Sequence, residues 1–121
     1  CIKCTTRIAY PNGYTGWVKE MNALKPRTKC LVEANKLVTK DRNQSYGDPH
    51  DDFLCISTLW NTYLSRALDT DVRIRPHDVG IMMGLLKIAR MAVSPDKEDH
   101  YHDLAGYTAC AFELKPDDSQ E

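Results

Sequence analysis

The sequence predicts an all-α fold, an antiparallel helical bundle of about four main helices with an irregular N-terminal arm. Three observations favour it. Apolar residues recur at helical spacing in four segments, no stretch of useful length alternates apolar and polar residues as a strand does, and the connections are short. Short connections favour antiparallel neighbours. Because 121 residues suffice for one ordinary domain, we expect an arm at 1–27, a bundle domain at 28–115 and an acidic tail at 116–121.

The arm is defined by its density of turn-forming residues. Pro11, Asn12, Gly13 and Gly16 lie close together, which is typical of irregular structure. Trp17 begins a short stretch with amphipathic helical spacing. One hypothesis is therefore that the arm docks on another protein, with Trp17 as its aromatic anchor.

Two helices are expected on either side of a polar connection at 41–49. The first begins at Thr28, as its N-cap, and ends near Lys40, and the second begins with Pro49 directly after Asp48. Functional residues often lie on such connections, and the candidates here are Asp41, Arg42 and Tyr46. The residues of the second helix expected to point inward are Phe53, Ile56, Leu59, Trp60, Tyr63 and Ala67.

The third predicted helix, at 76–93, is apolar on nearly every side, which indicates either a central helix or one used in a dimer interface. Asp78 in its first turn complements the helix dipole. Pro95 ends this helix, and a fourth is expected from about Lys97 to Leu114. The residues of the fourth helix expected to point inward are Tyr101, Leu104, Ala105, Thr108, Ala111 and Phe112.

Composition excludes several classes of protein. A net charge of -1 offers no electrostatic footprint for bulk nucleic acid. No apolar run approaches the roughly 20 residues that span a bilayer, so we expect no membrane partner. The five cysteines are an odd, scattered set, as in proteins of a reducing compartment. Cys1 and Cys4 form a C-x-x-C pair, but no second pair of ligands lies nearby, so zinc is not expected.

The candidate site combines two cations of the third helix with two carboxylates of the fourth. At about 100° per residue, Lys87 and Arg90 lie within roughly 60° of each other, so both can hold phosphates. Asp99 and Asp103 share one helix face, and carboxylates of this kind bind Mg²⁺ together with substrate phosphates. They are the candidate catalytic residues and metal ligands, with Mn²⁺ as the alternative ion. Further candidate metal ligands are Asp52 and Glu33.

The same residues also have a purely structural interpretation. Lys87 and Arg90 can bury their methylene stems while their charged ends reach water. Asp103 can instead neutralise one of them between adjacent helices, as part of a salt-bridge cluster. Both interpretations stay open on the sequence alone.

Several short motifs carry a resemblance to a small uncharacterised family that is common in phage and prophage genomes. The similarity covers roughly residues 30–115, and its motifs are Asp41-Arg42, Tyr46-Gly47, Asp78-Val79, the 86–90 segment Leu-Lys-Ile-Ala-Arg and the 103–107 segment Asp-Leu-Ala-Gly-Tyr. The pattern of Lys-x-x-Arg followed by Asp-x-x-x-Asp-x-x-x-Tyr also resembles the phage nucleotide-modification-associated domain. More distantly, it is similar to the all-α MazG-like nucleoside triphosphate pyrophosphohydrolases.

The resemblance implies a nucleotide (NTP or dNTP) as partner, with Asp41, Arg42 and Tyr46 as the loop candidates for contact with it. It also implies a homo-oligomer and, for a phage-encoded protein, the cytoplasm of the host cell. MazG-like enzymes hydrolyse NTPs or dNTPs to NMP and pyrophosphate with Mg²⁺ held by a Glu-rich helix and a Glu-x-x-Asp helix. This chain has no Glu-Glu-x-x-Glu, and Asp99-x-x-x-Asp103 is spaced differently, so individual catalytic roles do not carry over. Two hypotheses follow: a Mg²⁺-dependent pyrophosphohydrolase, or a non-catalytic phage accessory protein that binds a nucleotide or a host protein.

Overall fold

The computed structural model describes residues 23–41 and 47–117, and throughout these two stretches the regular structure is helical, without a strand. The elements are α2 (Pro26–Lys36), the π-helical turn η1 (Leu37–Asp41), α4 (Pro49–Leu68), α5 (Pro76–Val93) and α6 (Glu98–Glu113). The prediction of an all-α fold is confirmed. The arm with Trp17, the C-x-x-C pair of Cys1 and Cys4, and most of the acidic tail lie outside the described residues.

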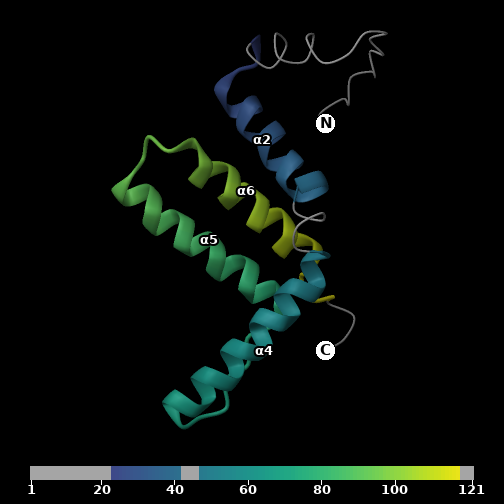
Figure 1. Ribbon diagram of the computed structural model, residues 1–121, viewed down its shortest axis with the longest axis vertical. Coiled ribbons are helices and arrows are strands. Elements are labelled where there is room, and N and C mark those ends of the chain that lie inside the picture. The colour runs from purple at the N-terminus through teal and green to yellow at the C-terminus, as the bar shows by residue number, and fades with distance from the viewer. Residues whose placement is uncertain (1–22, 42–46, 118–121) are drawn as a thin grey trace.

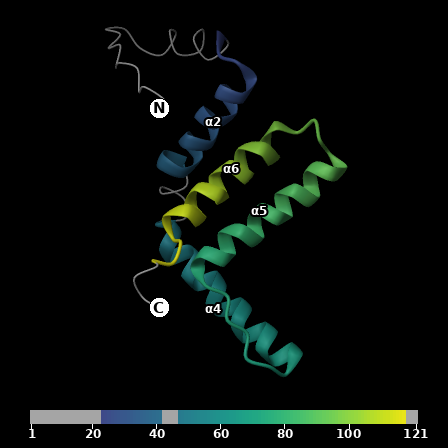
Figure 2. The same cartoon turned by 180° about the vertical axis from the view of Figure 1, so that it is seen from behind.

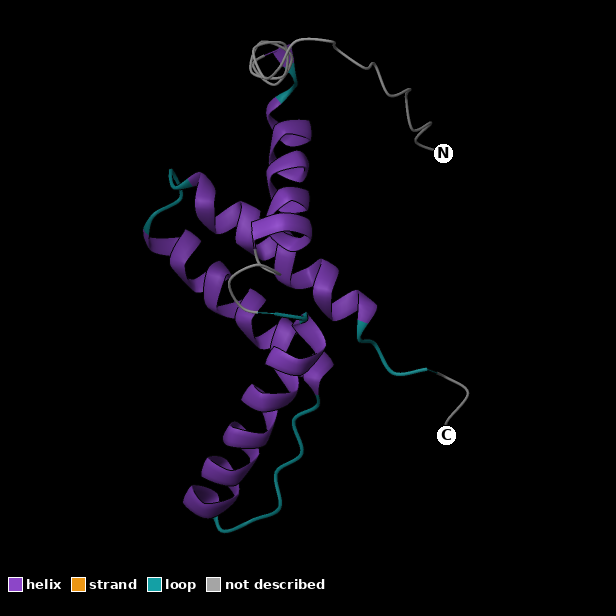
Figure 3. Cartoon of the chain, turned by 45° about the vertical axis from the view of Figure 1, so that its right-hand side comes forward, coloured by secondary structure: helices purple, strands orange, loops and turns teal. Residues whose placement is uncertain are grey.

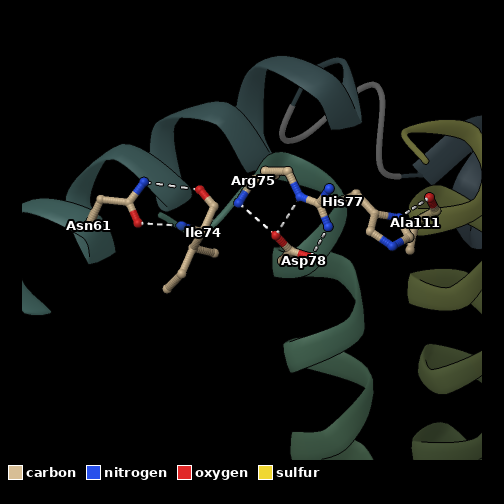
Figure 4. Close-up of polar contacts among 6 residues, drawn as sticks. All are labelled: Asn61, Ile74, Arg75, His77, Asp78 and Ala111. Carbon is tan, nitrogen blue, oxygen red and sulfur yellow. Dashed lines mark hydrogen bonds and ion pairs between the residues drawn. The ribbon is translucent and has the colours of Figure 1, made fainter. Parts of the chain in front are cut away.

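The arrangement is built on a hairpin of α5 and α6. These two helices lie side by side, joined by a short turn at 94–97, and α2 packs on α6 (Figures 1 and 2). α4 contacts the start of α5 and extends away from the hairpin. The connection at 69–75 then returns along α4, as Figure 3 shows. There the side chain of Asn61 donates to the carbonyl oxygen of Ile74 at 3.0 Å and accepts from its N–H at 2.7 Å (Figure 4).

Most predicted helix boundaries are confirmed, and one cap is wrong. The third predicted helix has the bounds of α5, and α4 begins at Pro49 after Asp48, whose carboxylate accepts from the N–H of His50 at 2.8 Å. Thr28, however, is not an N-cap. The N-cap is Lys25, three residues earlier, because Pro26 takes the first helical position, where its fixed φ favours the helix and its missing N–H costs nothing.

The core is small and lies where α4 meets the hairpin. Phe53, Val79 and Cys110 are buried there, one from each of α4, α5 and α6. The predicted inward positions of Leu59, Tyr63 and Phe112 are wrong, since these side chains are 63%, 72% and 69% exposed. Ala67, Tyr101 and Thr108 are exposed as well. An apolar stripe at helical spacing is buried only where another element packs against it, and most of α4 extends away from the hairpin (Figure 1).

The hairpin closes tightly because α5 presents glycines to α6. Gly80 and Gly84 are both buried. A Cβ added at Gly80 would lie 2.8 Å from the Cβ of Ala111 and 3.1 Å from the carbonyl oxygen of Tyr107. A Cβ at Gly84 would meet only the flexible end of Leu104, at 3.2 Å. His77 adds a polar link at this end, with Nδ1 2.8 Å from the carbonyl oxygen of Ala111, so Nδ1 carries the donated proton (Figure 4).

The start of α5 is stabilised by Asp78, which confirms the predicted capping role. Its carboxylate accepts from the N–H of Arg75 at 2.9 Å and pairs with the Arg75 guanidinium at 2.9 and 3.1 Å (Figure 4). The hydrogen bond from the Arg75 side chain is the main cause that lowers the pKa of the Asp78 carboxyl, and burial opposes it. The same contact raises the pKa of Arg75.

None of the helices in the described part of the chain combines the length and the hydropathy that a bilayer span requires.

The glycine contact generates a first prediction. We expect Gly80→Ala to lower the free energy of unfolding by about 1–3 kcal/mol, because the added methyl group meets Ala111 and backbone and forces the two helices apart. Gly84→Ala is the matched control. There the gain in helix propensity, about 1 kcal/mol, offsets a contact that Leu104 can relieve by rotating. Urea unfolding checks both variants, and equal stability of the two would contradict the tight approach at Gly80.

The Asp78 contact generates a second prediction, on pH dependence. A carboxyl whose pKa is lowered in the folded state stabilises the fold above its unfolded pKa, and this stabilisation is lost as the pH falls through the folded pKa. We expect Asp78→Asn to cost about 1 kcal/mol at pH 7 and progressively less below about pH 4. Asp71→Asn, which removes the partner of Arg73 in an exposed pair, should change stability little. Thermal unfolding across the pH range measures the loss of stability in Asp78→Asn. A loss that does not change with pH would show that the ionised carboxylate of Asp78 is not its cause.

Candidate functional site

Lys87 and Asp103 are the predicted site residues that the structure brings into contact. Lys87 of α5 is buried, with a side chain 9% exposed, and its Nζ lies 2.5 Å from Oδ2 of Asp103 on α6, whose side chain is 25% exposed. Lys87 follows Gly80 and Gly84 on the side of α5 that faces α6. The pair therefore joins the two helices of the hairpin, and this is the arrangement that the structural interpretation describes.

The other predicted site residues lie apart from this pair. Arg90 is exposed, although it follows Lys87 by less than one turn. Asp99 is exposed in the first turn of α6, where it complements the helix dipole. Glu33 pairs with Lys36 on α2 at 3.0 Å, and Asp52 is partly buried in the first turn of α4. Of the loop candidates, Asp41 ends η1, whereas Arg42 and Tyr46 lie outside the described residues.

The predicted Mg²⁺ site requires its candidate carboxylate ligands to lie close together. Within 23–41 and 47–117, no group of three or more His, Cys, Asp or Glu side chains converges on a point where an ion could bind. Asp103 already neutralises Lys87, and Asp99, Asp52 and Glu33 are on three different helices. The described residues therefore do not by themselves fit a Mg²⁺ site.

A second feature, which was not among the predicted sites, is a cleft of about 690 Å³ between the first turns of α2 and α6. Its volume lies within the range of small-molecule sites, roughly 300–1,000 Å³. The residues that line it come from both helix starts: Leu24, Pro26, Arg27, Lys29, Cys30, Leu31, Glu98, Tyr101 and His102. We call it the α2–α6 cleft. Most of its wall is apolar, with a few charged groups at the helix ends.

The electrostatics on the α2 side of the α2–α6 cleft favour an anion. Helix N-termini carry partial positive charge, and acidic residues commonly occupy the first turn for that reason. α2 has no acidic residue in its first turn but has Arg27 and Lys29 there, directly after Lys25 at the N-cap. On the opposite wall, the hydroxyl of Tyr101 donates to the carbonyl oxygen of Pro95 at 3.0 Å, which orients the ring. The cleft therefore combines two cations on α2 with an aromatic ring and the carboxylate of Glu98 on α6.

Sequence reasoning missed this cleft for two reasons. The boundary expected at Thr28 assigned Arg27 to the arm, and Tyr101 was expected to point into the core. A signal was present in Pro26, a good first helical residue, since it places two cations in the first turn of a helix against the usual preference.

Comparison with known proteins shows the family. The model of the family described as "Domain of unknown function (DUF6378)" matches residues 29–115, which include α2, η1, α4, α5 and α6 apart from the first turn of α2. No solved structure matches this chain.

Two phage proteins are similar to this chain. The Gene 55 protein of Mycobacterium phage D29 is 36% identical over 80 residues, which cover 66% of this chain and 49% of that protein. The Gene 55 protein of Mycobacterium phage L5 is 34% identical over 91 residues, which cover 74% of this chain and 55% of that protein. The chain thus spans about half the length of these relatives, and they support a phage origin. It belongs to the DUF6378 family.

Proposed function

We propose that this protein is a phage accessory protein that binds a nucleotide in the α2–α6 cleft, as a non-catalytic relative of the MazG-like pyrophosphohydrolases. The observation that carries the proposal is the cationic first turn of α2. Arg27 and Lys29 line the cleft beside a helix N-terminus whose partial charge has the same sign. A phosphate group compensates both at once, through charge-assisted hydrogen bonds and through the helix end.

The rest of the cleft suits the other half of a nucleotide. Leu24, Pro26 and Leu31 supply an apolar wall, and Tyr101 supplies a ring against which a base can stack. Glu98 and His102 supply polar groups that can bind base edges or a sugar hydroxyl. This combination of an apolar wall with few polar groups is typical of small-molecule sites.

The Lys87–Asp103 pair supports the non-catalytic form of the proposal over the hydrolase. A carboxylate that neutralises a buried lysine is not available as a metal ligand without leaving that cation unpaired. The pyrophosphohydrolase, with Asp99 and Asp103 as metal ligands and Lys87 and Arg90 on the phosphates, is the competing hypothesis. It rests on the resemblance and on rearrangement of this pair.

The nucleotide proposal predicts a charge-specific loss of binding. In isothermal titration calorimetry with a panel of NTPs, dNTPs and NMPs, we expect Arg27→Gln and Lys29→Gln each to weaken binding about tenfold or more, since a hydrogen bond to a charged group contributes about 1.5–3 kcal/mol. Arg73→Gln, on the exposed connection after α4, is the matched control and should bind as the wild type does. Affinity should also fall as the salt concentration rises. Equal affinities in all three variants would exclude this cleft.

A pyrophosphate-release assay distinguishes binding from catalysis. With the same nucleotides and either Mg²⁺ or Mn²⁺, the non-catalytic proposal expects no release. Release that is lost in both Asp99→Asn and Asp103→Asn would establish the hydrolase instead. Asp99→Asn keeps this test interpretable, because Asp99 is exposed and its replacement should leave the protein folded.

A structural role for the Lys87–Asp103 pair predicts a strong coupling in stability. We expect Asp103→Asn or Lys87→Met alone to cost about 2–3 kcal/mol, somewhat less than for a fully buried pair because Asp103 is partly solvated. The double variant Lys87→Met with Asp103→Leu should return to within about 1 kcal/mol of the wild type, because neither charge is then left unpaired. Urea unfolding measures this cycle. Additive losses, together with weaker nucleotide binding in Lys87→Met, would instead favour a phosphate-binding Lys87.

A further inference from the structure

The side of α5 that points away from α6 carries large apolar side chains at the surface. We call it the outer face of α5, and it consists of Ile81, Met82, Leu85, Leu86, Ile88 and Val93. Their exposed fractions run from 37% for Met82 to 84% for Val93. The opposite side of the helix is the one buried against α6 and the start of α4, through Val79, Gly80, Gly84 and Lys87. A helix that is apolar all round is stable in water only when it is covered all round.

We infer that the outer face of α5 is a homodimer interface, on which α5 of a second copy packs antiparallel about a two-fold axis near Leu85. This inference goes beyond the proposed nucleotide function and does not rest on it, because none of the residues that line the α2–α6 cleft belongs to α5.

The spacing of the outer face is that of helix-on-helix packing. Ile81, Leu85, Ile88 and Ala92 are separated by four, three and four residues, the alternation of core positions in a coiled coil. Met82, Leu86, Ala89 and Val93 repeat the same spacing on the adjoining strip. Two neighbouring strips of this kind form the ridges and grooves into which side chains of another helix fit. The partner that this surface accepts is therefore a helix with apolar side chains at the same spacing, and α5 itself provides one.

The charges around the outer face favour a second copy in the antiparallel direction. In a two-fold interface each region meets its own equivalent, so a central charge would face a like charge. Between Ile81 and Ala89 the only charged residue is Lys87, which is buried against α6 and paired with Asp103. At the start of α5, Asp78 is already paired with Arg75, so this end adds no unpaired charge to the interface. The partial charges of the helix ends then favour the antiparallel direction, because it brings the positive N-terminal end of one helix toward the negative C-terminal end of the other, whereas parallel packing would bring like ends together.

The size of the outer face is compatible with a dimer. Six large side chains at these exposures present on the order of 100 Å² each, so the face offers on the order of 600 Å² of apolar surface per copy. A standard stable interface buries about 800 Å² per partner, and the exposed Ala89 and Ala92 add to the area available. The small core leaves the fold with few other buried apolar contacts.

The first test is the mass of the 121-residue chain in solution, measured by light scattering after size exclusion at about 50 µM. We expect a dimer for the wild type. Leu85→Glu, which places two carboxylates at the proposed axis, should give a monomer or weaken the dimer at least 100-fold. Phe112→Glu is the matched control, since Phe112 is an apolar residue on α6 that is at least as exposed as Leu85, and this variant should remain a dimer. A monomeric wild type would overturn the inference, as would a Leu85→Glu dimer of unchanged affinity.

The second test does not depend on a destabilising charge. In the antiparallel arrangement position 85 faces its own equivalent, whereas position 93 lies eight residues further on, about 12 Å from the axis. Under mild oxidation we expect Leu85→Cys to form a disulfide-linked dimer above the wild-type background, and Val93→Cys not to do so. Cross-linking through position 93 as well as position 85 would indicate a parallel pair, in which every position faces its own equivalent, and would overturn the proposed arrangement. Circular dichroism of each variant confirms that the helices are retained.

Discussion

The close approach of α5 to α6 is the contact on which the rest of the structure depends. It requires that no side chain stand at Gly80, where the backbone of Tyr107 and the methyl group of Ala111 come within reach of a Cβ. The same side of α5 then carries Lys87, which would be an unpaired cation in the hairpin without Asp103. Packing at one end of the hairpin and charge neutralisation further along are thus two parts of one interface.

Three of the four described α-helices have acidic residues in their first turn, as the helix dipole favours, and the fourth, α2, contributes to the candidate site. α4 and α5 both carry aspartates in their first turns, as Asp51 and Asp52 in one and Asp78 in the other. α6 begins with Glu98 and Asp99. α2 alone among the described α-helices has cations there, and those cations line a cleft. A helix end that opposes its own dipole is less stable than it could be, and a bound phosphate would remove that cost.

The two sides of α5 have different roles: one stabilises the fold of a single copy, and the other is the proposed interface with a second copy. One side is committed to α6 through glycines, the lysine and Val79, while the other side keeps coiled-coil spacing at the surface. A nucleotide in the α2–α6 cleft and a second copy on the outer face of α5 would occupy different parts of the molecule. Association would therefore change the stability of the fold without closing the cleft.

The sequence by itself determined the fold class, the bounds of α5, the start of α4 and the cap at Asp78, because helical periodicity, proline and short-range capping act within one or two turns. It could not decide whether Leu59, Tyr63 and Phe112 face a core, since an apolar stripe has the same spacing whether its partner is the same chain or another. The sequence also provided no reason to expect different environments for Lys87 and Arg90. Only the tertiary structure separated them, by placing Asp103 against one and leaving the other at the surface. The cleft likewise required the structure, because it is formed by two helix starts about 70 residues apart that packing alone brings together.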